Sequence, residues 1–181
     1  MLYLTLFTLT LVTSQLLEME VSQAVEEYLS QLNLAPTQYD IVVSDQVPEG
    51  AALAHWVEAS GKDTAVFFFN RELLLQLSRR ERRVLIAHEV GHLAPECQLL
   101  GRRIFREMCA DVVSLQLVPV DDVAALLARS IVMFPYYPAQ KEFIYRYTVI
   151  QENRVASREL ERKTTRTTRF PPEHEDWHDC A

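Results

Sequence analysis

The chain has 181 residues, of which 49% are hydrophobic, and this length and composition indicate one globular domain rather than a disordered segment. Only four residues are glycine, which favours helices over a turn-rich β-barrel. The formal net charge of -7 argues against nucleic-acid binding as the main function, because phosphate contacts require clustered Lys and Arg.

The first 17 residues carry no charged side chain. Their Leu/Thr alternation is typical of a strand with one buried face. Leu2 to Val12 also suits the apolar core of a signal peptide or a membrane anchor, although the basic residues that usually precede such a core are missing. We therefore set residues 1–15 apart as an apolar segment of either kind, and expect membrane association only through residues 1–17.

The three cysteines, Cys97, Cys109 and Cys180, form no Cys-x-x-Cys metal pattern, and their odd number is not typical of a disulfide framework. The sequence therefore favours free thiols in a reducing compartment, which corresponds to a cytoplasmic location. If the protein is exported, a Cys97–Cys109 disulfide is the alternative.

An amphipathic helix is predicted over residues 16–32, where apolar residues recur at helical spacing and glutamates occupy the other face. Three strands are predicted next, at Tyr39–Ser44, Ala52–Glu58 and Thr64–Asn70. Gly61 lies in the expected turn of a hairpin between the second and third of them. The aromatic run in Thr64–Asn70 indicates a buried strand.

A short helix is predicted over Arg71–Leu77. Ser78 and Glu81 then form a capping box that begins the next helix, and Pro95 is expected to end that helix. Four arginines oppose the dipole of this helix in its first turn, so they should be solvated or paired with acidic neighbours: Arg79, Arg80, Arg82 and Arg83.

Three further helices are predicted beyond Pro95. The first runs from Gln98 to Leu117, the second follows an Asp121-Asp122 cap over Val123–Met133, and the third spans Lys141–Lys163. Residues 16–163 then form a single domain, and residues 164–181 are expected to be a flexible polar and acidic tail.

The most informative pattern lies in the helix that begins after Ser78. His88 and His92 are four positions apart, which places both imidazoles on one face of a helix. Glu89 lies between them, where it can reach a water molecule on a metal ion held by the two histidines. Apart from Glu89 the stretch 84–95 has no charged residue, and burying these polar groups without a partner would be costly. The pattern therefore indicates a zinc-dependent hydrolase.

A catalytic zinc site requires a third protein ligand. The metzincin pattern would place a third histidine at the position of Gln98 and a glycine at that of Pro95, so this pattern fails. Glu107, in the next predicted helix, fits instead. Asp111 follows one turn later on the same face, where it can accept the free N–H of a liganding imidazole.

The combination of His88-Glu89-Val90-Gly91-His92 with Glu107-x-x-Ala110-Asp111 resembles the gluzincin metallopeptidases over roughly residues 80–117. The preceding helix and three strands are similar to the scaffold of the minigluzincins and to the cores of heat-shock and CaaX-type proteases, without the several membrane spans of those proteases. The resemblance implies an α+β, zincin-like fold. Its parts are an N-terminal helix, a small sheet of three or four strands, the active-site helix, a glutamate helix and further C-terminal helices.

This resemblance implies hydrolysis of a peptide or protein substrate, with one zinc ion held by His88, His92 and Glu107. Glu89 would take a proton from the activated water and pass it to the leaving amine. We expect the strand Thr64–Asn70 to offer its edge to the substrate. Gluzincins typically stabilise the oxyanion with a Tyr or His beyond the glutamate helix, and no motif chooses among the candidates Tyr136, Tyr137, Tyr145, Tyr147 and His174.

Two alternatives remain open. A protein of this fold could keep the metal for structure and act as a regulatory or binding protein for a single protein partner, although the intact Glu89 favours an enzyme. An enzyme could also be dedicated to one such partner. In the tail, His174, His178 and Cys180 could fold back onto the zinc, but a solvated tail is the simpler expectation.

Overall fold

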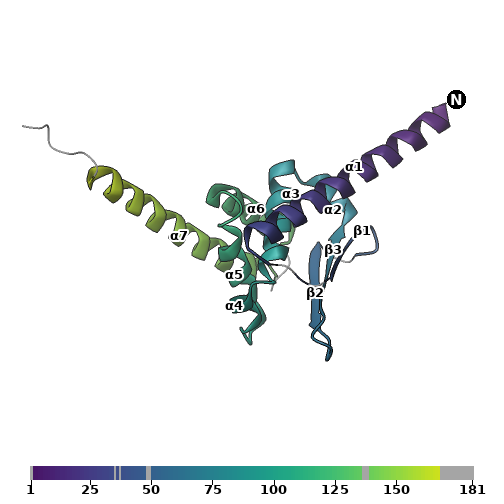
Figure 1. Ribbon diagram of the computed structural model, residues 1–181. Coiled ribbons are helices and arrows are strands. Elements are labelled where there is room, and N and C mark those ends of the chain that lie inside the picture. Colours follow the sequence, from purple (N-terminus) through teal and green to yellow (C-terminus); the bar gives the residue numbers. More distant parts are fainter. Residues whose placement is uncertain (1, 35, 37, 48–49, 136–138, 168–181) are drawn as a thin grey trace, which may run out of the picture.

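In the computed structural model, the described residues form seven helices and one three-stranded mixed sheet, which confirms the predicted α+β class (Figure 1). The backbone is described for residues 2–34, 36, 38–47, 50–135 and 139–167, and the side chains for those of them between 14 and 154. The elements are α1 (Leu2–Gln31), β1 (Gln38–Ser44), β2 (Ala51–Val57), β3 (Asp63–Asn70), α2 (Arg71–Gln76), α3 (Arg79–Gly91), α4 (Pro95–Gln98), α5 (Arg103–Ser114), α6 (Val120–Met133) and α7 (Ala139–Thr167).

Helix α1 begins at Leu2 and continues without a break to Gln31, so of the alternatives for the N-terminal segment the strand is wrong. A helix pairs the backbone groups of this uncharged run within the run itself, whereas a strand would need a neighbouring strand. The second half of α1 buries Leu17, Val21 and Val25, as the helical spacing predicted. Within the described part of the chain, no helix has both the length and the apolar character needed to cross a membrane.

The sheet has the strand order β1-β3-β2, with β1 parallel and β2 antiparallel to β3. The three strands and the hairpin at Gly61 agree with the prediction, and Gly61 has the positive φ of 82° that favours glycine in its turn. Ala65, Phe67 and Phe69 of β3 are fully buried in the main core. The expectation that this strand forms an edge is wrong, because the backbone of β3 is paired with β1 on one side and β2 on the other. The edge beside α3 is β2.

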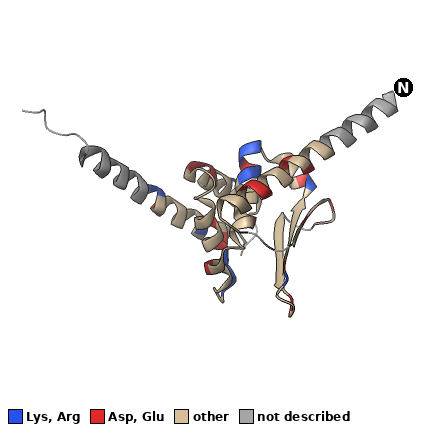
Figure 2. Ribbon diagram, viewed as in Figure 1, with Lys and Arg blue, Asp and Glu red and all other residues tan. Residues whose placement is uncertain are grey.

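Helix α3 begins with the predicted capping box, in which Ser78 and Glu81 bond each other's backbone N–H groups. The arginines of its first turn face the glutamates of α1, and Figure 2 shows this meeting of basic and acidic segments. Arg82 lies 2.9 Å from Glu20, and Arg83 lies 2.8 Å from Glu27. The predicted pairing is thus present, and it orients α3 against α1.

The helix boundaries after α3 differ from the prediction in two places. Helix α3 ends at Gly91, and Pro95 begins the short α4 instead of ending α3. Proline favours the first position of a helix because its fixed φ is already helical. The helix expected from Gln98 to Leu117 is the shorter α5, which begins at Arg103 and ends at Ser114, and α6 begins at Val120 after Pro119 instead of being capped by the two aspartates.

The long helix predicted over Lys141–Lys163 is α7, and it extends to Thr167. The expected tail therefore begins as helix at residue 164. Residues 168–181 lie outside the described part of the chain.

Helices α3 and α5 lie in close contact at Gly91. A Cβ atom added to Gly91 would lie 2.8 Å from the carbonyl oxygen of Ala110 and 3.2 Å from its Cα. Both are backbone atoms of α5, so they cannot move aside without moving the helix. Only glycine allows this spacing, which brings the residues of α3 that face α5 next to Glu107 and Asp111.

Substitution Gly91→Ala should therefore destabilise the protein by about 1–3 kcal/mol, because the added methyl group pushes α5 away from α3. Helix propensity alone would predict a gain of about 1 kcal/mol from the same change, so the sign of the effect is diagnostic. Urea denaturation measures it. The control is Gly101→Ala, since no atom lies within 4 Å of a Cβ at Gly101. An increase in stability for Gly91→Ala would contradict the close approach.

Candidate active site

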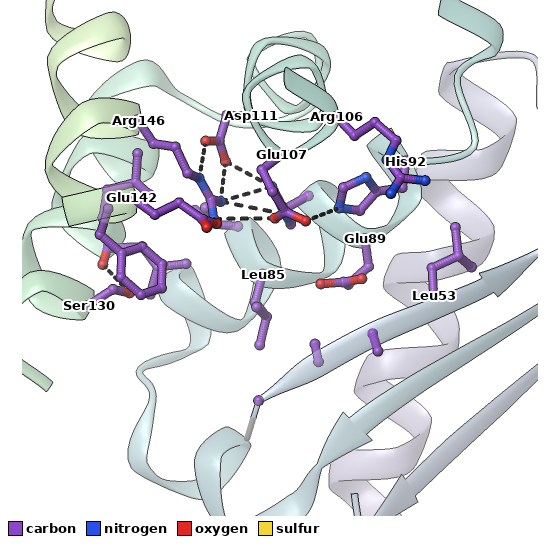
Figure 3. A pocket seen from close by; sticks show the side chains of 18 of the residues that line it. Leu53, Leu85, Glu89, His92, Arg106, Glu107, Asp111, Ser130, Glu142 and Arg146 are labelled. Carbon is purple, nitrogen blue, oxygen red and sulfur yellow. Dashed lines mark hydrogen bonds and ion pairs between the residues drawn. The ribbon is translucent and has the colours of Figure 1, made fainter. Parts of the chain in front are cut away.

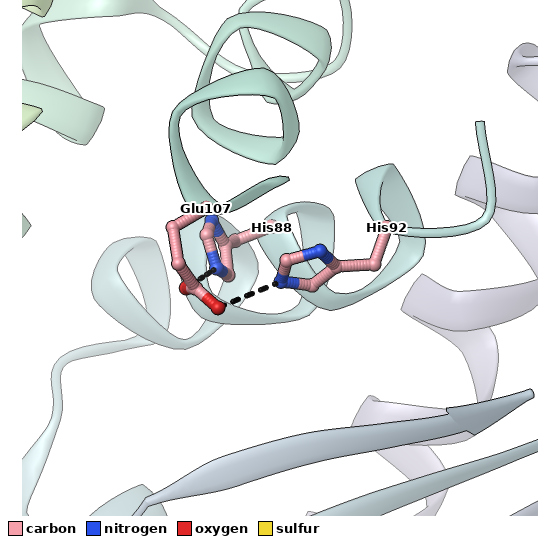
Figure 4. Close-up of side chains that lie close together, drawn as sticks. All are labelled: His88, His92 and Glu107. Atoms are coloured by element: carbon pink, nitrogen blue, oxygen red, sulfur yellow. Dashed lines mark hydrogen bonds and ion pairs between the residues drawn. The ribbon is translucent and has the colours of Figure 1, made fainter. Parts of the chain in front are cut away.

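Three side chains from α3 and α5 converge on one point (Figure 4). His88 Nε2 lies 3.2 Å from Glu107 Oε2, and His92 Nε2 lies 3.7 Å from Glu107 Oε1. One donor atom from each of the three residues lies within 4.8 Å of the other two. Ligands about 2.0–2.2 Å from a tetrahedral zinc ion are roughly 3.3–3.6 Å apart, so this donor set fits such an ion.

Asp111 and Arg146 support these groups from behind (Figure 3). Asp111 Oδ1 lies 2.8 Å from His88 Nδ1, which is the contact predicted from the sequence, and the imidazole nitrogen donates in it. Arg146 donates to both oxygens of Asp111, at 2.7 and 2.8 Å, and lies 3.3 Å from Glu107 Oε2. Asp111 and Arg146 are 3% and 7% exposed, so these charges are paired away from water. Helices α5 and α7 are thereby joined through one buried network of ion pairs.

The proximity of these groups shifts their pKa values. Burial alone would lower the pKa of His88, but the Asp111 carboxylate outweighs burial and raises it to about 9. Burial would raise the pKa values of Asp111 and Glu107, whereas His88 and Arg146 hold both at about 2. Burial and the neighbouring His88 lower the pKa of His92 to about 4. At neutral pH the carboxylates of Asp111 and Glu107 are therefore balanced by His88 and Arg146.

Glu89 is 5% exposed, and burial raises its pKa to about 7. Figure 3 shows its carboxylate facing the space between α3 and the sheet. This space belongs to a cavity of about 820 Å³ that also reaches His88, His92 and Glu107. A carboxyl group with a pKa near neutrality, next to a candidate metal site and open to a cavity, is suited to accept and return a proton.

The cavity lies between β2 and the α6–α7 pair. Residues 50–53 and His55 form one wall, and the opposite wall contains Leu126, Phe134 and Phe143. His55 was not expected in the site; it contributes to the lining and is paired with Asp63. The volume and shape leave room for a segment of another molecule beside the three converging side chains.

None of the candidates for oxyanion stabilisation lies beside the cluster in the described part of the chain. Tyr136, Tyr137 and His174 are outside the described residues. Tyr145 is half-exposed, and Tyr147 packs against the core.

The residue that the sequence prediction missed is Arg146. Its signal in the sequence was weak but real, because it is the only charged residue in the apolar run 143–150 of α7. A lone arginine on an otherwise apolar stretch of helix requires a buried carboxylate or an exit to water. Only the packing of α7 on α5 shows that the partner is Asp111.

The expectation of free thiols is wrong for two of the three cysteines. Cys97 and Cys109 form a disulfide, which was the alternative stated above, and Cys97 is 1% exposed. The turn through α4 brings residues twelve positions apart to a Cα–Cα distance of 5.4 Å. The bond ties α4 to α5 two residues after Glu107. Cys180 is outside the described residues.

Replacing Arg146 by methionine should lower the free energy of unfolding by about 3–5 kcal/mol, because Asp111 would keep a buried charge without its main partner. Urea denaturation with a chelator present measures this effect without a contribution from bound metal. The matched control is Arg103→Met, since the Arg103 side chain is 76% exposed and its ion pairs should contribute at most about 1 kcal/mol. Equal effects of the two substitutions would contradict the role given to Arg146.

Comparison with known families agrees with the geometry of this site. Residues 15–135 match the sequence model of Peptidase family M48. No curated protein and no solved structure matches the chain. The matched range contains α3 and α5 with their converging side chains, ends before α7, and covers more than half of the chain. The chain therefore belongs to peptidase family M48, a family of gluzincin metallopeptidases, as its two motifs predicted.

Proposed function

We propose that this protein is a zinc-dependent endopeptidase in which His88, His92 and Glu107 hold the metal and Glu89 is the general base. The observation that carries the proposal is the position of Glu89. It lies beside three converging donor side chains and lines the same cavity as they do. A site that held a metal only for structure would have no use for a base with access to a cavity.

The chemistry that zinc supplies when bound is the lowering of the pKa of a water molecule to about 7 and the polarisation of a carbonyl group. Glu89 accepts the proton of the attacking water and later gives it to the leaving amine, and its raised pKa keeps both transfers close to thermoneutral. Asp111 accepts the Nδ1–H of His88, which leaves Nε2 free to bind the metal. Arg146 holds Asp111 in that orientation.

The substrate that fits this cavity is an extended peptide along β2. This strand is the edge of the sheet next to α3, and its residues 51–53 line the cavity. An edge strand offers backbone N–H and C=O groups to which a peptide can add as a further strand. We therefore assign to β2 the role that the sequence suggested for Thr64–Asn70, since β3 has both edges paired.

Substitution Glu89→Gln should abolish turnover, with a loss of about 10²–10⁴-fold or more, and leave one zinc ion per chain, because glutamine cannot accept the proton but keeps the size of the side chain. Glu107→Ala should instead lose the zinc. Metal analysis and digestion of a peptide library measure the two properties separately. Unchanged turnover in Glu89→Gln would overturn the mechanism. Zinc binding by wild type without any turnover would favour a regulatory protein.

Zinc binding should release at least one proton at pH 8, the one that His88 carries, and approach two at pH 6. The pKa of His88 in the metal-free site is about 9, so this group is protonated at both pH values and must lose its proton to bind a metal. Glu89, with a pKa of about 7, is mostly ionised at pH 8 and mostly protonated at pH 6, and the nearby cation would displace its proton.

Calorimetric titration in two buffers of different ionisation enthalpy counts these protons. The control is Asp111→Asn, which removes the carboxylate that raises the pKa of His88 and should reduce the release at pH 8. Zinc binding without proton release at pH 8 would show that His88 is neutral in the metal-free site.

A further inference from the structure

The two ends of the cavity differ in chemical character. The end formed by α6 and α7 is largely apolar, with Leu126, Met133, Phe134 and Phe143 among its lining residues. Helix α5 contributes Arg103 and Arg106 to the lining, and Arg103 lies 3.8 Å from Glu142 of α7. Figure 3 shows Arg106 beside His92, on the far side of the metal-ligand cluster from Ser130 and Glu142. A peptide lying in the cavity therefore meets apolar groups at one end and the Arg106 cation at the other.

The two arginines differ in how far their charge is already balanced. Arg103 lies 4.0 Å from Glu107 and 3.8 Å from Glu142, so its charge is shared with two carboxylates. Arg106 has no ion pair with any of the residues that the structure describes, and its side chain is exposed. It is therefore the cation at this end that is available to a ligand.

The position of these residues on α5 increases the need for an anion. Arg103 and Arg106 lie in the first turn of the helix, where the helix dipole is positive, and this turn contains no acidic residue. Arg102 directly precedes the helix and adds a third positive charge. The helix dipole opposes these positive charges, and a bound carboxylate would offset it.

We propose that Arg106 forms a carboxylate-recognition site at the His92 end of the cavity and selects the substrates of the proposed peptidase. The carboxylate belongs to the peptide, either as an Asp or Glu side chain or as a free C-terminus. The preferred peptide thus has an anionic group on the His92 side of the scissile bond and a large apolar residue toward α6 and α7. This inference rests on the proposed function for its biological meaning, but its test measures binding and requires no turnover.

The test uses the zinc-loaded full chain with Glu89→Gln and labelled extended peptides, whose binding is followed by fluorescence anisotropy. One set is C-terminally amidated and carries Glu at successive positions on either side of one large apolar residue. A second set is also amidated and has Gln in place of Glu at the same positions. A third set has Gln at these positions and a free C-terminal carboxylate. The best carboxylate peptide should bind about fivefold more tightly than its amidated Gln counterpart. The second and third sets distinguish a side chain from a C-terminus as its source.

Adding Arg106→Gln to the Glu89→Gln chain should remove the preference for carboxylate peptides. Adding Arg106→Glu instead should reverse it, so that peptides with Lys at the same position bind more tightly. The matched control is Arg102→Gln, which removes the same charge four positions earlier from a residue that does not line the cavity, and it should keep most of the preference. Equal binding of carboxylate and amide peptides, binding of none of them, or a preference that survives Arg106→Gln would overturn the inference. Hydrolysis by wild type without a carboxylate preference would leave the proposed function standing, whereas a clear preference without hydrolysis would contradict only the proposed function.

Discussion

The arrangement of the site depends on the balance of positive and negative charges among its buried side chains. Asp111 and Glu107 are acidic groups brought together with Glu89 between α3 and α5, and three carboxylates so placed would repel one another without cations. Arg146 supplies one positive charge from α7 and binds Asp111 with two hydrogen bonds. The packing of α7 on α5 and the orientation of His88 both follow from this contact.

The second constraint on the site is the short distance between the backbones of α3 and α5. The side chain of His88 meets Asp111 and Glu107 only because Gly91 lets α3 lie against the backbone of α5 at Ala110. The capping box and the ion pairs to α1 fix α3 at its other end. The position of the two histidines is therefore determined by rigid helices on both sides, and such preorganisation is what a metal site with an open cavity requires.

The sequence predicted the parts of this structure that depend on local chemistry. Ser78 and Glu81 mark the beginning of α3, and helix geometry alone places Asp111 one turn from Glu107. The features that the sequence prediction missed depend on packing between segments that are distant in the chain. The central position of β3 follows from pairing with β1, about 25 residues away, and the partner of Arg146 lies 35 residues earlier in the chain. The Cys97–Cys109 bond depends on the turn between α4 and α5, which lies in the stretch predicted as the start of the Gln98–Leu117 helix.

Charge balance also explains how the site can be formed before a metal binds. With Glu89 protonated, as below pH 7, the two charges of Asp111 and Glu107 equal those of His88 and Arg146, so the metal-free site is neutral. If the proposed site bound a divalent cation, with His88 neutral and Glu89 ionised, three carboxylates would be balanced by Arg146 and the two charges of the ion. The total would be zero in both states. The ion would thus replace two protons in a network whose remaining positive charge, on Arg146, comes from α7.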